Sequence, residues 1–189
     1  MRVIAGLYKG HSLKTLAGLD VRPTSDRLRE TLFNILAPKI ANTRFLDICA
    51  GSGAVAIEAL SRGASFALLI EVSKQATKVI QDNITHCKIP SNYIQITTSD
   101  ALSSLKKLEK NNALFDIVYF DPPYKSSIYL PVLQYLGEVT FLSDTSIVIV
   151  EHHSKFILPE IIGQLNCYRR LKQGETELSF YEVTKYNVN

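Results

Sequence analysis

The stretch that decides the fold is residues 44–56, Arg44-Phe-Leu-Asp-Ile-Cys-Ala-Gly-Ser-Gly-Ala-Val-Ala56. Its first part is apolar and rich in residues that favour strands, and its last part consists of small residues that fit a packed helix. Between them, Gly51 and Gly53 permit a tight turn in which backbone N–H groups approach a ligand closely. A strand, a glycine turn and a helix in this order predict a site for an adenosine-containing molecule when a correctly spaced acid follows. A purely structural turn is the alternative.

The rest of the chain continues the alternation of strand and helix. The expected strands are 44–49, 66–71, 93–98, 115–120 and 146–151, and the expected helices are 54–62, 73–87, 101–108, 127–136 and 154–165. Short apolar runs of this kind are typical of a mostly parallel sheet with helices on both faces. Near the end, 168–172 and 177–184 are separated by only four residues, which predicts an antiparallel hairpin. We therefore expect an α/β, Rossmann-like fold with a mostly parallel seven-stranded sheet and a C-terminal antiparallel hairpin.

Two carboxylates support a nucleotide site at the glycine turn. Glu71 ends the next predicted strand, 20 residues after Gly51, where it can accept both hydroxyls of a ribose. Asp100 follows the third strand, where it can accept from an adenine amino group or cap the next helix; both roles stay open. Because Gly51, Gly53 and Ala56 also match the G-x-G-x-x-G/A fingerprint, NAD(P) and S-adenosyl-L-methionine (SAM) both remain candidates.

The segment Asp121-Pro122-Pro123-Tyr124 follows the strand 115–120, at the edge where open α/β sheets bind ligands. Pro122 and Pro123 have no N–H, so the carbonyl groups of Asp121 and Pro122 are left as acceptors. Both residues are held in an extended conformation because each precedes a proline. Together with the Asp121 carboxylate, the Pro122 carbonyl suits an NH₂ group. Tyr124 adds an aromatic face on which a planar base can stack, a contact that contributes about 1–3 kcal/mol to binding of the base. A proline strand stop with a surface tyrosine is the alternative.

This acceptor pair favours one of the two cofactors. An exocyclic base amine is a poor nucleophile because its lone pair is delocalised into the ring. Two acceptors aimed at its hydrogens favour the tetrahedral geometry and stabilise the positive charge that develops on attack. Its partner would be an electrophilic methyl group on a sulfonium, so the segment indicates SAM. Lys125, Ser126, Ser127 and Tyr129 are expected to form a mobile rim beside it, and His152 and His153 an ordinary polar cluster.

The beginning of the chain differs from the rest. Residues 2–5 and 12–16 flank a turn between Gly6 and Gly10, which predicts a β-hairpin. A helix is expected over 25–36, capped by Thr24 or Ser25 and ended by Pro38. We expect residues 1–24 to be a basic N-terminal extension and residues 25–189 to be the catalytic domain.

The net charge of +3 is unevenly distributed. Residues 1–44 carry a net charge of +5, and the remaining 145 residues carry −2. A basic leading segment on a neutral-to-acidic body suggests an arm for a polyanion, although a solvated basic face without a partner is equally compatible. Three arginines crowd the start of the first helix, where cations oppose its dipole by about 0.3–1 kcal/mol each and a phosphate ligand would explain them. They are Arg22, Arg27 and Arg29.

Composition excludes other classes. No apolar run approaches the 18 or so residues that span a membrane. The three cysteines, Cys49, Cys87 and Cys167, are widely spaced and form no C-x-x-C, which argues against a disulfide framework or a zinc site. We expect a reduced, cytoplasmic protein without a metal. Nothing in the sequence indicates an interface, so a monomer is expected.

The motifs resemble those of a known family. Asp47–Gly53, Glu71, Asp100 and Asp121–Tyr124 are similar to the SAM and target-amine motifs of Rossmann-like methyltransferases that modify exocyclic amines. The leader, with Arg22-Pro-Thr-Ser-Asp-Arg-Leu-Arg29, and the Gly174–Tyr181 segment resemble the bacterial 16S rRNA (guanine(966)-N(2))-methyltransferase family.

The resemblance implies a role for each candidate residue. It implies SAM-dependent methylation of a guanine N2 in 16S rRNA of the small ribosomal subunit, with Asp121, Pro122 and Tyr124 as the catalytic residues. SAM would be held by Asp47, Ala50, Gly51, Gly53, Glu71, Asp100 and Asp121. The rRNA would be held by Arg2, Lys9, Lys14, Arg22, Arg27 and Arg29. The alternatives are a DNA adenine or cytosine amino-methyltransferase, a non-catalytic RNA-binding protein on this scaffold and, least favoured, a nicotinamide dehydrogenase.

Overall fold

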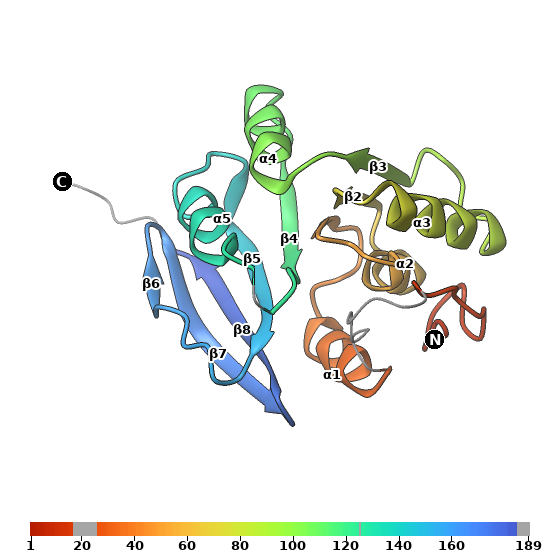
Figure 1. Cartoon of the computed structure of the whole chain (residues 1–189), viewed down its shortest axis with the longest axis horizontal. Helices are drawn as coiled ribbons and strands as arrows, with labels where there is room; N and C mark the ends of the chain where they lie inside the picture. The colour runs from red at the N-terminus through yellow and green to blue at the C-terminus, as the bar shows by residue number, and fades with distance from the viewer. Residues whose placement is uncertain (17–25, 125, 185–189) are drawn as a thin grey trace.

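A computed structural model describes residues 1–16, 26–124 and 126–184 of the chain (Figure 1). Within these residues, five helices accompany one eight-stranded sheet. The helices are α1 (Asp26–Leu36), α2 (Ala54–Ser61), α3 (Lys74–His86), α4 (Ala101–Lys110) and α5 (Tyr129–Leu136). The strands are β1 (Arg44–Ile48), β2 (Phe66–Glu71), β3 (Ile94–Thr98), β4 (Phe115–Phe120), β5 (Leu142–His153), β6 (Ile161–Ile162), β7 (Leu165–Gln173) and β8 (Thr176–Val183).

The strand order places the two sequence motifs side by side. The sheet runs β3-β2-β1-β4-β5-β8-β7-β6, with β1 to β5 parallel and β6 to β8 antiparallel. The order reverses between β1 and β4, where Ile48 lies opposite Phe120. Ligands of open α/β sheets bind at the carboxyl ends of the strands beside such a reversal. The predicted Rossmann-like fold is confirmed.

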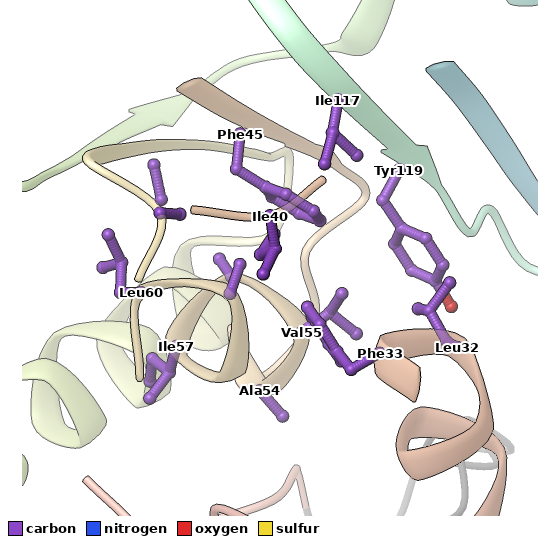
Figure 2. Close-up of a cluster of buried hydrophobic side chains, with 14 of the residues drawn as sticks. Leu32, Phe33, Ile40, Phe45, Ala54, Val55, Ile57, Leu60, Ile117 and Tyr119 are labelled. Carbon is purple, nitrogen blue, oxygen red and sulfur yellow. The ribbon is translucent and has the colours of Figure 1, made fainter. Parts of the chain in front are cut away.

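Helices cover both faces of the sheet and form two hydrophobic cores. Side chains alternate along each strand, so Phe45 packs with α1 and α2 whereas Leu46 packs with α4 and α5. Figure 1 shows α1 and α2 on one side of β4 and α5 on the other. Figure 2 shows part of the first core, with buried side chains from α1, α2, β1 and β4. Burial on both faces explains why the parallel strands read as continuous apolar runs.

The prediction of a helix over 154–165 was wrong. After β5, the Phe156 N–H donates to the His153 carbonyl at 2.8 Å in a turn, and Ile161–Ile162 forms β6 beside β7. Leu158 and Ile162 are buried and four residues apart, which imitates helical periodicity. Pro159 lies between them, and a proline removes a backbone donor from a helix interior. Beyond the seven strands expected, the sheet therefore gains the short β6.

Residues 1–16, the described part of the leader, form a hairpin-like loop that packs against the rest of the chain. A single bridge joins Arg2 to Ser12, so the two expected strands are reduced to one ladder contact. Val3 and Leu13 are buried in the core shared by α1 and α2. The expected caps Thr24 and Ser25 lie outside the described residues.

Candidate functional site

Hydrogen bonds to β2 hold the first residues of the glycine turn, directly after β1. The Cys49 and Ala50 N–H groups donate to the Ile70 carbonyl at 2.9 and 3.1 Å, which holds the turn beside β2. Cys49 itself has a positive φ of 67°, a conformation that costs a side-chain-bearing residue energy. Burial and nearby carboxylates raise the pKa of the Cys49 thiol, so it stays neutral. Nothing in the sequence pattern marked Cys49 as strained.

The two glycines do different work. Gly53 has φ 75° and stands at the N-terminus of α2, where an added Cβ would lie 3.1 Å from Leu69 and 3.2 Å from Ile80. Gly51 has φ 56°, and an added Cβ there would meet no atom within 4 Å. A side chain at Gly53 would therefore crowd Leu69 and Ile80 in addition to straining the backbone. Gly51 faces open space at the edge of the sheet, where a ligand can approach the backbone.

Glu71 lies beside this turn, as its spacing predicted. One carboxylate oxygen accepts from the Gly51 N–H at 2.9 Å, and the other accepts from the Ser73 N–H at 2.8 Å. The side chain is buried, and each oxygen keeps lone pairs for a further donor. These contacts fix both the carboxylate and the turn, but its role toward a ribose remains a prediction.

Asp47 supports the turn from inside the core. One of its carboxylate oxygens accepts from the Ala56 N–H, at the start of α2, at 3.2 Å. Burial, with a smaller contribution from the charge of Glu71, raises the pKa of Asp47 to about 7. With 1% of its surface exposed, Asp47 shapes the turn rather than offering a free carboxylate to solvent.

Asp100 caps α4. Its carboxylate accepts from the Ser103 N–H at 2.9 Å, and this bond lowers the pKa of the exposed Asp100. The capping role left open by the sequence is therefore present. Contact with an adenine amino group remains a prediction.

The target segment begins where β1 and β4 end together. The Asp121 N–H donates to the Ile48 carbonyl at 3.2 Å, which joins the first residue of this segment to the last residue of β1. The Pro122 carbonyl accepts from the Tyr129 hydroxyl at 3.0 Å. Asp121 is partly buried and Pro122 is buried. The structure thus brings the acceptor-rich segment next to the glycine turn.

Tyr124 is braced from the antiparallel end of the sheet. Its hydroxyl lies 2.6 Å from the hydroxyl of Thr176, at the start of β8. Its ring meets the His153 ring edge-on at 5.5 Å between centroids. Thr176 was not identified from the sequence, because only the pairing of β5 with β8 brings it to this place. Stacking of Tyr124 on a base remains a prediction.

Two other predictions for this region have different outcomes. His152 is fully buried, and its Nε2 lies 2.8 Å from the Ser179 hydroxyl, consistent with a polar cluster in the sheet. Tyr129, expected in a mobile rim, is 2% exposed and begins α5. That expectation was wrong, because burial of an aromatic ring against Phe120 and Phe156 outweighed its position in a polar segment. Lys125 lies outside the described residues.

The basic residues assigned to rRNA fall into four groups, of which buried Arg29 is the last. Arg2, Lys9 and Arg27 are exposed. Lys14 is also exposed but forms a 2.8 Å ion pair with Asp82. Arg22 lies outside the described residues.

Arg29 does not fit the prediction. Its side chain is fully buried, and its Nη2 donates to the Arg2 carbonyl and, at 3.0 Å, to Asp26. Its Nε lies 3.8 Å from the buried Glu58 carboxylate. A guanidinium enclosed in this way cannot reach RNA, so Arg29 anchors the leader instead of binding a phosphate.

The described residues include no cluster of three or more His, Cys, Asp or Glu side chains that could hold a metal ion. In the same part of the chain, no helix combines the length and apolarity needed to cross a membrane.

The strand order and the site at the β1–β4 reversal define a class, the Rossmann-like fold of the SAM-dependent methyltransferases. Residues 1–182 match the family model described as "Conserved hypothetical protein 95", and the chain belongs to this family. The family resemblance drawn from the motifs is confirmed.

The relatives cover nearly the whole chain. "Putative rRNA methyltransferase YlbH" of Bacillus subtilis is 34% identical over 96% of this chain and 98% of its own length. "Ribosomal RNA small subunit methyltransferase D" of Escherichia coli is 32% identical over 96% of this chain and 89% of its own. The solved structure "Putative methyltransferase yhhF from Escherichia coli" is 32% identical, covers 98% of this chain and 99% of its own, and has a TM-score of 0.85.

Proposed function

We propose that this protein uses SAM to methylate the exocyclic N2 amine of a guanine in 16S rRNA of the small ribosomal subunit. The observation that carries the proposal is the 3.2 Å bond between the Asp121 N–H and the Ile48 carbonyl. This bond holds Asp121, the first residue of the candidate acceptor segment, beside the last residue of β1, from which the glycine turn begins, and so supports the proposal. A cofactor site and an amine site on neighbouring strand ends are what a group transfer between the two requires.

The residues around the turn fit SAM. Gly51 leaves its surroundings open for close approach to the backbone, and the Glu71 carboxylate, held at the end of β2, suits ribose hydroxyls. Ala50 and Gly53 complete the turn, Asp47 fixes its inner side, and Asp100 would accept from the adenine amine. When bound, SAM supplies an electrophilic methyl group on a sulfonium.

The chain's own groups prepare the amine. The Asp121 carboxylate and the Pro122 carbonyl accept its two hydrogens, which favours a tetrahedral nitrogen with an available lone pair. The target base would be flipped out of its stack, and the Tyr124 ring would stack on the face of that base. As the N–C bond forms, the S–CH₃ bond of the sulfonium would break and leave a neutral thioether, so the positive charge passes to the nitrogen, which must lose one proton. The Asp121 carboxylate, bonded to that N–H, is placed to receive it.

The choice of rRNA rests on the relatives and on charge. "Ribosomal RNA small subunit methyltransferase D" of Escherichia coli is named for this class of substrate. The exposed Arg2, Lys9 and Arg27 add positive charge suited to phosphates, and Lys14 and Arg22 remain further candidates. Methylation of guanine N2 follows from the motif resemblance alone.

The direct test of the site is Asp121→Ala. We expect it to lower methyl transfer to unmodified 16S rRNA by roughly 10²–10³-fold, because one of two charge-stabilising acceptors and the proton acceptor are lost. Labelled SAM measures the transfer, and calorimetry measures SAM affinity, which should stay near wild type. Retained turnover would remove Asp121 from the mechanism. Loss of SAM binding would assign it to the cofactor site instead.

A further inference from the structure

The Tyr129 side chain connects the target segment to the strand beside it. Its hydroxyl donates to the Pro122 carbonyl at 3.0 Å and also lies 3.3 Å from the Glu151 carbonyl of β5. The ring packs against Phe120 and Phe156, with centroid separations of 5.8 and 5.1 Å. Only 2% of Tyr129 is exposed, so packing on two sides holds the hydroxyl in place.

The target segment depends on such an external donor. Pro122 and Pro123 have no N–H, and the Asp121 N–H is already bonded to β1. The Pro123 carbonyl is held separately, by the Ser126 N–H at 2.7 Å. The direction of the Pro122 carbonyl is therefore set by the Tyr129 hydroxyl. This carbonyl is one of the two acceptors assigned to the amine.

The hydroxyl is suited to remain a donor. Burial, reinforced by the nearby Asp121 carboxylate, raises the pKa of Tyr129 well above its usual value. A neutral hydroxyl donates one hydrogen, and a carbonyl oxygen has two lone pairs. One lone pair of Pro122 can thus be used by Tyr129 while the other stays available for a second donor.

We propose that Tyr129 is a positioning residue for methyl transfer, whose hydroxyl aims the Pro122 carbonyl at the amine of the target base. This assignment rests on the proposed function. It predicts an effect on the transfer step and none on the cofactor, because Tyr129 acts only through the acceptor pair. Misorientation of one acceptor costs less than its removal, so the rate loss should be smaller than that of Asp121→Ala.

The chain provides a matched control. Tyr181 is a fully buried tyrosine of β8 whose hydroxyl donates to the Pro159 carbonyl at 2.8 Å. Tyr129→Phe and Tyr181→Phe therefore each remove one hydrogen bond from a buried tyrosine hydroxyl to a proline carbonyl. Only the first bond reaches the target segment.

The experiment compares both variants as full-length proteins, with saturating SAM and 16S rRNA. Tyr129→Phe should lower kcat roughly 5- to 30-fold and leave SAM affinity within about twofold of wild type, while Tyr181→Phe should leave kcat unchanged. Thermal unfolding should show similar small losses for the two variants. 3-Fluorotyrosine at position 129, which keeps the hydroxyl, should restore the rate.

Each other outcome overturns the inference. An unchanged kcat in Tyr129→Phe, or an equal loss in Tyr181→Phe, would make the bond purely structural. Loss of SAM binding in Tyr129→Phe would assign the hydroxyl to folding. If the wild type is active and Tyr129→Phe is equally active, only this inference is contradicted. If the wild-type protein itself is inactive, the proposed function is contradicted.

Discussion

At the scale of single residues, burial of Asp47 behind the glycine turn makes the stability of the protein depend on pH. The carboxyl group is buried behind the turn, and its pKa is raised to about 7, from a value of about 3.8 expected in the unfolded chain. Between these two values the folded protein holds a proton that the unfolded chain has released. Stability from this group is therefore fully present below about pH 4 and is lost as the pH rises to 7.

This difference predicts the behaviour of Asp47→Asn. The difference between pKa values of about 3.8 and about 7 corresponds to roughly 4 kcal/mol, so the free energy of unfolding of the wild type should fall by up to that amount relative to the variant between pH 4 and pH 8. Urea unfolding of both proteins across this range measures the difference and cancels the contributions of other groups. A constant difference between the two proteins would show that Asp47 does not titrate in this range.

Much of the site could be predicted residue by residue, because its chemistry is local. Glu71 ends one predicted strand and Asp121 follows another, and parallel strands bring their carboxyl ends to one edge. Arg29 and Tyr129 were misplaced because their surroundings are distant in sequence. Arg29 is buried by Glu58, and Tyr129 is buried by Phe156. The one available signal was that Arg29 lies four residues before Phe33, beside the apolar stripe of its helix.

At the scale of elements, the leader is joined to α2. The Ile4 and Ala5 N–H groups donate to the two oxygens of the buried Glu58 carboxylate, at 2.8 and 3.1 Å. Arg62 donates to the same carboxylate at 2.7 Å. Since α2 begins at the glycine turn, the basic leader and the candidate cofactor site share one helix. No sequence pattern predicted this link, because it consists of backbone donors that meet a single side chain.

Gly6 determines how closely the leader approaches α2. It has φ 84°, and an added Cβ would lie 1.7 Å from the Ser61 carbonyl oxygen. Gly10 has φ 86°, but an added Cβ there would meet nothing within 4 Å. Alanine at Gly10 should cost about 1–2 kcal/mol from backbone strain alone. Gly6→Ala should cost about 1–3 kcal/mol more, because the leader must also move away from α2.

Urea unfolding of the two glycine variants at one pH measures both costs. Because the backbone strain is matched, the difference between them reports the contact alone. Equal losses would mean that the leader does not pack against α2 in solution.

At the scale of the whole molecule, the positive charge and the carboxylates of the site come from different parts of the chain. The excess of positive charge lies in the first 44 residues, whereas the carboxylates of the site belong to the rest of the chain. Reversing the exposed Arg2, Lys9 and Arg27 to glutamate should weaken binding of 16S rRNA and reduce the slope of log K against log salt, since fewer counterions are released. Binding at several salt concentrations measures this slope, and SAM affinity is the internal control. An unchanged slope would place the RNA on another surface.

The methylated nucleoside in the rRNA distinguishes the proposed reaction from its alternatives. Unmodified 16S rRNA, alone or assembled into small subunits, is incubated with the protein and SAM, digested to nucleosides and analysed by mass spectrometry. We expect one N2-methylguanosine per rRNA with the wild-type protein, formed roughly 10²–10³-fold more slowly with Asp121→Ala. A methyl group on adenine or cytosine would contradict the proposed function. So would the lack of any methylated nucleoside in either substrate while SAM binds normally.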